Sequence, residues 1–156
     1  MNDLTQKSQG PSMPTSDFKK IWDLIIGSSL ATLPSIVRAN LAISSIAFDE
    51  WEEKEQPKQK VKSLVSMSIS HLLDMKTLIE MACEVRNFIE FRHSISLIDD
   101  LVNALNAYLI EDKSLDRSSD ISSCFLFGLQ LSAEKIIENL NNLADFVYAN
   151  REVLNG

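Results

Sequence analysis

Apolar residues recur every three or four positions along most of the chain, which is the spacing of one face of an α-helix. The longest such stretch lies between Lys58 and Phe127 and contains neither proline nor glycine. No segment has the alternating pattern of a half-buried strand. The pattern therefore predicts an all-α protein, built as a single up-and-down bundle of four to five helices with long third and last helices.

Pro34 and Pro57 divide the first part of this pattern. Thr15 or Ser16 can cap a first helix by accepting a hydrogen bond from a free backbone amide. We expect this helix to run to about Leu33, because Pro34 disfavours helical geometry at the residue before it. A second segment, either one kinked helix or two short ones, should continue from Pro34 towards Glu55.

The third helix is predicted from Lys58 to Arg92, where the apolar spacing is almost unbroken. The spacing slips near His93, and Ser96 followed by Asp99 has the serine-x-x-acid form of a capping box. We therefore expect a break between Arg92 and Ser96, after which a fourth helix begins.

The last helix is predicted from Ser119 to Glu152 and carries a heptad seam, which is typical both of antiparallel bundles and of dimers. The wider stripe that Phe127 and Leu131 add favours packing within one chain, with a homodimer through the last helix as the alternative. Gly128 indicates a close helix contact. The seam consists of Phe125, Leu129, Ser132, Ile136, Leu140, Leu143 and Val147.

The length of 156 residues suits one domain with its own core. Residues 16–154 are expected to form this single helical-bundle domain, and the polar residues 1–15 are expected to be a flexible N-terminal tail. The tail lacks the apolar stretch of a secretory signal peptide. The apolar segment Ile21 to Leu33 is too short and too interrupted to span a membrane. We therefore expect a cytoplasmic protein without a membrane segment.

The formal net charge of −7 makes the protein acidic, so it repels a phosphate backbone at long range. General nucleic-acid binding is not expected, whereas a protein partner is. The two cysteines, Cys83 and Cys124, do not have the spacing of a zinc-ligand pair or a redox motif, which predicts reduced thiols. No cofactor is predicted.

Histidine is scarce, with His71 and His93 only, and this limits acid-base and metal chemistry. Glu90 and His93 form a Glu-x-x-His pair of the kind found in di-iron bundles. Such a site needs a second copy of the pair, but Ser68 occupies the corresponding position before His71. No metal site is therefore predicted.

Arg86, Asn87 and His93 form the one remaining group with possible chemistry. Two helical turns separate Arg86 from His93, so on one continuous helix both would share a face with Glu90 between them. An arginine and a histidine separated by four to six residues, with a polar residue directly after the arginine, resemble the signature of the HEPN superfamily of small all-α proteins. The ordinary structural alternative is an ion pair between Arg86 and Glu90, four residues apart.

The HEPN resemblance implies a small dimeric, metal-independent ribonuclease. In such an enzyme Arg86 would stabilise the charge that develops on the phosphate, and His93 would act as general acid or base. Asn87 would help to orient the substrate. The arginine and histidine would meet their counterparts across the dimer.

The function that the sequence favours is a non-enzymatic protein-interaction module of the regulator, adaptor or inhibitor type, in bacterial or phage style. The HEPN-like ribonuclease is the alternative, so an enzyme is the less favoured class. A further alternative is a bundle that binds an apolar ligand in a pocket lined by aromatic side chains. These would be Trp22, Trp51, Phe88, Phe91, Phe125 and Phe127.

Overall fold

The computed structural model describes residues 16–28, 30, 32–49, 55–110 and 119–156, with no statement about the side chains of 45–49, 55–58, 110 and 119–126. The tail expected over residues 1–15 lies outside these ranges. The described residues contain helices and no strand, which confirms the all-α prediction. The helices are α2 (Asp17–Ile25), α3 (Leu33–Asp49), α4 (Glu55–Val85), α5 (Ile89–Ile110), α7 (Ser119–Ala149) and α8 (Arg151–Asn155).

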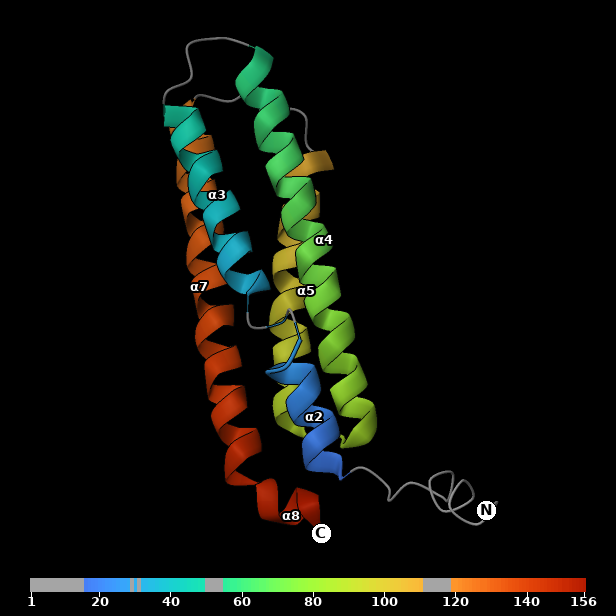
Figure 1. Cartoon of the computed structure of the whole chain (residues 1–156). Coiled ribbons are helices and arrows are strands. Elements are labelled where there is room, and N and C mark those ends of the chain that lie inside the picture. The colour runs from blue at the N-terminus through green and yellow to red at the C-terminus, as the bar shows by residue number, and fades with distance from the viewer. Residues whose placement is uncertain (1–15, 29, 31, 50–54, 111–118) are drawn as a thin grey trace, which may run out of the picture.

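Four antiparallel columns make up the bundle (Figure 1). The short helices α2 and α3 follow one another in the first column, and α4, α5 and α7 form the other three. Each column packs against two neighbours, with α3 between α4 and α7, and α5 between the same two helices. The up-and-down arrangement is as predicted. The long helices α4 and α7 have 31 residues each.

The first helix begins where the sequence predicts and ends earlier. Ser16 caps α2 by accepting a hydrogen bond from the Lys19 amide at 3.2 Å. The chain leaves the helix after Ile25, not at Leu33, because Ser28 provides local alternatives to helical hydrogen bonds. Its hydroxyl donates to the Leu24 carbonyl and accepts from the Leu30 amide.

A three-residue turn at 86–88 separates α4 from α5. In this turn the Phe88 amide donates to the Arg86 carbonyl at 2.9 Å. The predicted break between Arg92 and Ser96 is therefore wrong, because both residues lie inside α5 and Ser96 does not start a helix. The third helix ends before this turn.

Tertiary contacts hold this turn, which contains neither glycine nor proline. The Phe88 ring meets the Phe146 ring of α7 edge to face, with centroids 5.1 Å apart, and the Phe91 ring at 5.7 Å. Both distances lie in the favourable range for aromatic pairs. Above the turn, Lys76 of α4 donates to Asp99 of α5 at 2.8 Å. This hydrogen bond raises the pKa of Lys76.

The heptad seam of α7 packs within the chain, whereas Phe127 and Leu131, which were expected to widen it, are largely exposed. Its members from Leu129 to Val147 are buried, apart from the half-buried Ser132. The predicted last helix is nevertheless divided, because Asn150 separates α7 from the short α8 and its side-chain amide donates to the Phe146 carbonyl at 2.9 Å. The buried core also takes residues from every other helix, among them Ile21, Val37, Leu41, Leu72, Met75, Ile79, Phe91, Ile98, Leu105 and Leu154.

The close helix contact expected at Gly128 is wrong. A Cβ atom built on this glycine would meet no described atom within 4 Å, and the residue is exposed. At Gly27, which ends α2, a Cβ atom would approach the Asp23 carbonyl oxygen to 3.1 Å. Adding a methyl group is therefore expected to cause a steric clash at Gly27 but not at Gly128.

We predict that Gly128→Ala raises the free energy of unfolding by up to about 1 kcal/mol, because alanine has a higher helix propensity and finds open space. Urea denaturation followed by circular dichroism measures this. Gly27→Ala is the matched control and should lower stability, since a backbone oxygen would have to move. A loss of stability in Gly128→Ala would contradict the open surface.

Tyr108 lies on α5 and is only 3% exposed. Its burial raises the pKa of the phenol. An unfolded tyrosine ionises near pH 10. Above that pH the unfolded chain loses the proton while the folded chain keeps it, so stability falls as pH rises. Between about pH 9 and 11.5, the wild-type free energy of unfolding should fall more steeply than that of Tyr108→Phe. Equal slopes would contradict this assignment.

Candidate functional site

Arg86 lies in the turn after α4 and binds to α2. Its Nε donates to Oδ2 of Asp17 at 3.0 Å. Asp17 lies in the first turn of α2. The ion pair between Arg86 and Glu90 that the sequence offers as the structural alternative does not form, because Arg86 pairs with Asp17 instead. Both partners are partly exposed, so the pair is a moderate tether between α2 and the 86–88 turn.

Asn87 occupies the middle of the same turn and is exposed. Its Oδ1 accepts a hydrogen bond from the Cys83 thiol at 3.3 Å. The thiol is free, and the bond closes the last turn of α4 onto the residues that follow. Asn87 is thus positioned by α4.

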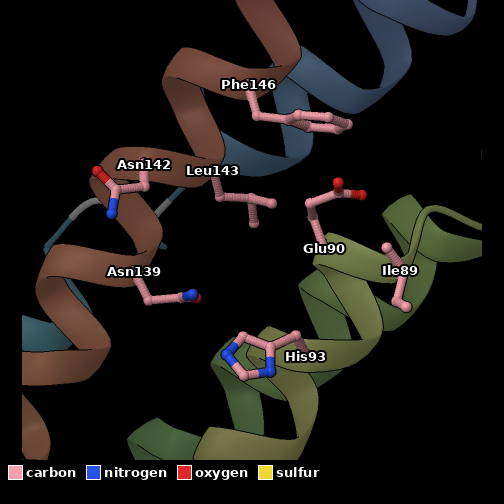
Figure 2. A pocket seen from close by; sticks show the side chains of 7 residues that line it. All are labelled: Ile89, Glu90, His93, Asn139, Asn142, Leu143 and Phe146. Carbon is pink, nitrogen blue, oxygen red and sulfur yellow. The ribbon is translucent and has the colours of Figure 1, made fainter.

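His93 lies on α5, one turn beyond Glu90, and points towards α7 (Figure 2). The 86–88 turn separates it from α4, so the expectation that Arg86 and His93 share one continuous helix is wrong. In one chain the Arg86 guanidinium binds α2, whereas His93 faces the space between α5 and α7. The structure therefore does not bring the two predicted catalytic residues to one site within the protomer.

The space that His93 faces is a cleft of about 320 Å³ between α5 and α7. We call it the α5–α7 cleft. Leu143 and Phe146 of α7 point towards α5 and supply its apolar side (Figure 2). The complete lining is Ile89, Glu90, His93, Asn139, Asn142, Leu143 and Phe146.

A buried hydrogen bond fixes one polar group of the cleft. The Ser94 hydroxyl donates to Oδ1 of Asn139 at 2.6 Å and lies 3.0 Å from the Glu90 carbonyl oxygen. Ser94 is 1% exposed, so water does not compete for this bond. With Oδ1 occupied, the NH₂ group of Asn139 remains to donate into the cleft.

The cleft therefore combines an apolar surface with hydrogen-bonding groups on both sides. Glu90 accepts, Asn139 donates, and His93 and Asn142 can do either. This combination is typical of sites that bind one side chain or a short segment, where apolar contact supplies affinity and polar groups set orientation. The amides Asn139 and Asn142 were not predicted, although both flank the apolar seam of the last helix.

The aromatic pocket of the third hypothesis does not form among the described side chains. Phe88 and Phe91 pack against each other in the core, whereas Trp22 stacks on Phe18 with centroids 5.4 Å apart. Phe127 is 54% exposed. The side chains of Trp51 and Phe125 lie outside the described residues.

Within the described residues, no group of three or more histidine, cysteine, aspartate or glutamate side chains is placed to hold a metal ion. No described helix is long and apolar enough to cross a bilayer. No family model, curated protein or solved structure matches the chain. The α5–α7 cleft is therefore interpreted from its own residues.

We predict that Asp17 and Arg86 couple by about 0.2–1 kcal/mol in a double-mutant cycle with alanine at each position. Urea denaturation at low and high salt measures the coupling, which should shrink at about 1 M salt. Arg92→Ala, on the exposed side of α5, is the control and should show no coupling to Asp17→Ala. A coupling that does not change with salt would contradict an ion pair between partly exposed groups.

Proposed function

We propose that the protein is a non-enzymatic protein-interaction module of the regulator, adaptor or inhibitor type, which docks a segment of a partner protein in the α5–α7 cleft. The observation that carries the proposal is the cleft itself, with its apolar side of Leu143 and Phe146 and its rim of carboxylate, imidazole and amide groups. The proposal places the protein in the cytoplasm, where thiols such as Cys83 stay reduced.

The rim of the cleft carries an exposed anchor for such a partner. Ile89, the first residue of α5, is 66% exposed and lines the cleft. A large apolar side chain beside polar groups fits a docking surface better than a solvated helix start, because interfaces combine an apolar centre with a polar rim. The partner would cover Ile89 and place one apolar side chain against Leu143.

The surface that remains for a partner is an outer one. The buried seam of α7 packs inside the bundle, so a homodimer through that seam would require the bundle to open. A partner is therefore proposed to bind the rim of the cleft and the outward side of α5 and α7. This separates docking from folding, because exposed residues can be replaced with little effect on stability.

The HEPN-like ribonuclease remains the second hypothesis from the sequence, and the structure changes what it requires. Arg86 would have to leave Asp17 to bind a phosphate, and His93 would have to act from the α5–α7 cleft. Because a protein partner requires neither change, the interaction module is the proposal that we favour.

We predict that Ile89→Asp lowers recovery of the partner about tenfold or more, because it replaces the apolar anchor with a solvated carboxylate. The measurement is an affinity pull-down of the tagged full chain from its native cells, with and without ribonuclease, quantified by mass spectrometry. Leu73→Asp is the matched control, because Leu73 is an exposed apolar residue on α4, away from the cleft. It should recover the partner as the wild type does.

Three outcomes would contradict the proposal. Equal recovery by Ile89→Asp and wild type would place docking elsewhere, and equal loss in Leu73→Asp would indicate non-specific binding. Recovery of RNA alone, with RNA cleavage that His93→Ala abolishes, would establish the ribonuclease instead.

A further inference from the structure

The outward side of α7 carries two large apolar residues that the fold covers only in part. Phe127 and Leu131 lie one helical turn apart and are 54% and 44% exposed. They lie opposite the buried side of the same helix, to which Leu129 and Ile136 belong. A helix normally leaves charged residues on this side, so two large apolar side chains in one exposed patch indicate a contact surface.

One residue of the cleft lining, Asn142, shares a helical face with this patch. Phe127, Leu131, Glu138 and Asn142 follow one another at steps of four, seven and four residues, which keeps them on one helical face. Asn142 lines the cleft. The distance along α7 from Phe127 to Asn142 is about 22 Å, the length of roughly four helical turns.

Carboxylates dominate the charge along this surface. Glu138 and Asp145 are exposed on α7, and Glu90 and Asp100 lie on α5, against the cation Lys135. None of these four carboxylates forms an ion pair within the part of the chain that the structure describes. By contrast, Asp17, Asp23 and Asp99 each have a basic partner.

We infer that the partner segment is a basic amphipathic helix that lies along α7 from the Phe127–Leu131 patch to the α5–α7 cleft. The inference rests on the proposed function and names the partner's chemistry. Apolar side chains one turn apart would cover Phe127 and Leu131, and another, about three turns on, would enter beside Leu143 and Ile89. Lysine or arginine on its flanks would meet Glu138, Asp145 and Asp100.

A second copy of this chain fits the surface less well. In a two-fold dimer the same patch faces itself, so the carboxylates of one copy would oppose those of the other. The whole chain also carries a net charge of −7, which adds to the repulsion at low salt. The charge complementarity therefore favours a basic partner.

Synthetic peptides test the inference directly. A fluorescein-labelled peptide of about five helical turns carries leucine at the positions that would face α7 and lysine on its flanks. A second peptide replaces each lysine with glutamate, and a third has the basic composition in scrambled order. Fluorescence anisotropy with the full chain should show binding of the basic amphipathic peptide only, with at least about tenfold weaker binding of the other two.

Variants locate the peptide on the surface. Leu131→Ser and Ile89→Ser remove the apolar contact without adding charge and should each weaken binding about tenfold, whereas Leu73→Ser should leave it unchanged. Glu138→Lys combined with Asp145→Lys should weaken the basic peptide and strengthen the acidic one. Circular dichroism and thermal unfolding of every variant ensure that a loss of binding is not a loss of fold.

Three results would overturn the inference: binding of the scrambled basic peptide as tightly as the patterned one, an equal effect of Leu73→Ser, or tighter binding of the acidic peptide. The peptide experiment and the pull-down can fail independently of each other. If the cellular partner depends on Ile89 but the basic helix does not bind, docking at the cleft stands and the assigned chemistry is wrong.

Discussion

The edge-to-face contact between Phe88 and Phe146 is the interaction on which the candidate site depends. It attaches the turn after α4 to α7 directly before α5 begins, and so it helps to fix which side of α5 faces α7. Without it, the apolar spacing of residues 58–92 would favour one continuous helix, because nothing in the backbone of Arg86, Asn87 or Phe88 forces a break. The turn is thus set by packing and not by turn-forming residues.

This turn separates groups that the sequence places together. Arg86 stays with α4 and reaches Asp17 on α2, whereas Glu90 and His93 move to α5 and face α7. An arginine and a histidine two helical turns apart are neighbours only while the helix is continuous. Two residues that suggest one catalytic face therefore serve two surfaces, one joining α2 to the bundle and the other lining the α5–α7 cleft.

The sequence predicts the helical class and the presence of two long helices, because periodic burial along a helix is a local property that repeats many times. It gives their ends only approximately, since α4 ends at Val85 and α7 at Ala149. It also locates the Ser16 cap, which depends on hydrogen bonds within one turn. It does not locate the 86–88 turn, because the Phe88–Phe146 pair joins residues far apart in the chain. The same reason explains why Asn139 was missed: its role comes from Ser94, on another helix.

The two sides of α7 obey different constraints, and this difference supports a docking role. The buried side, from Leu129 to Val147, stabilises the bundle by removing apolar area from water. Phe127 and Leu131 contribute less per residue, since 54% and 44% of their surface stays exposed in the folded chain. Exposed apolar side chains also promote non-specific association. Their position on the same helix as carboxylates that form no ion pair among the described residues is easier to explain by a partner that covers both. Under this proposal the acidic surface has a double effect, because it would repel other copies of the chain and attract a basic segment.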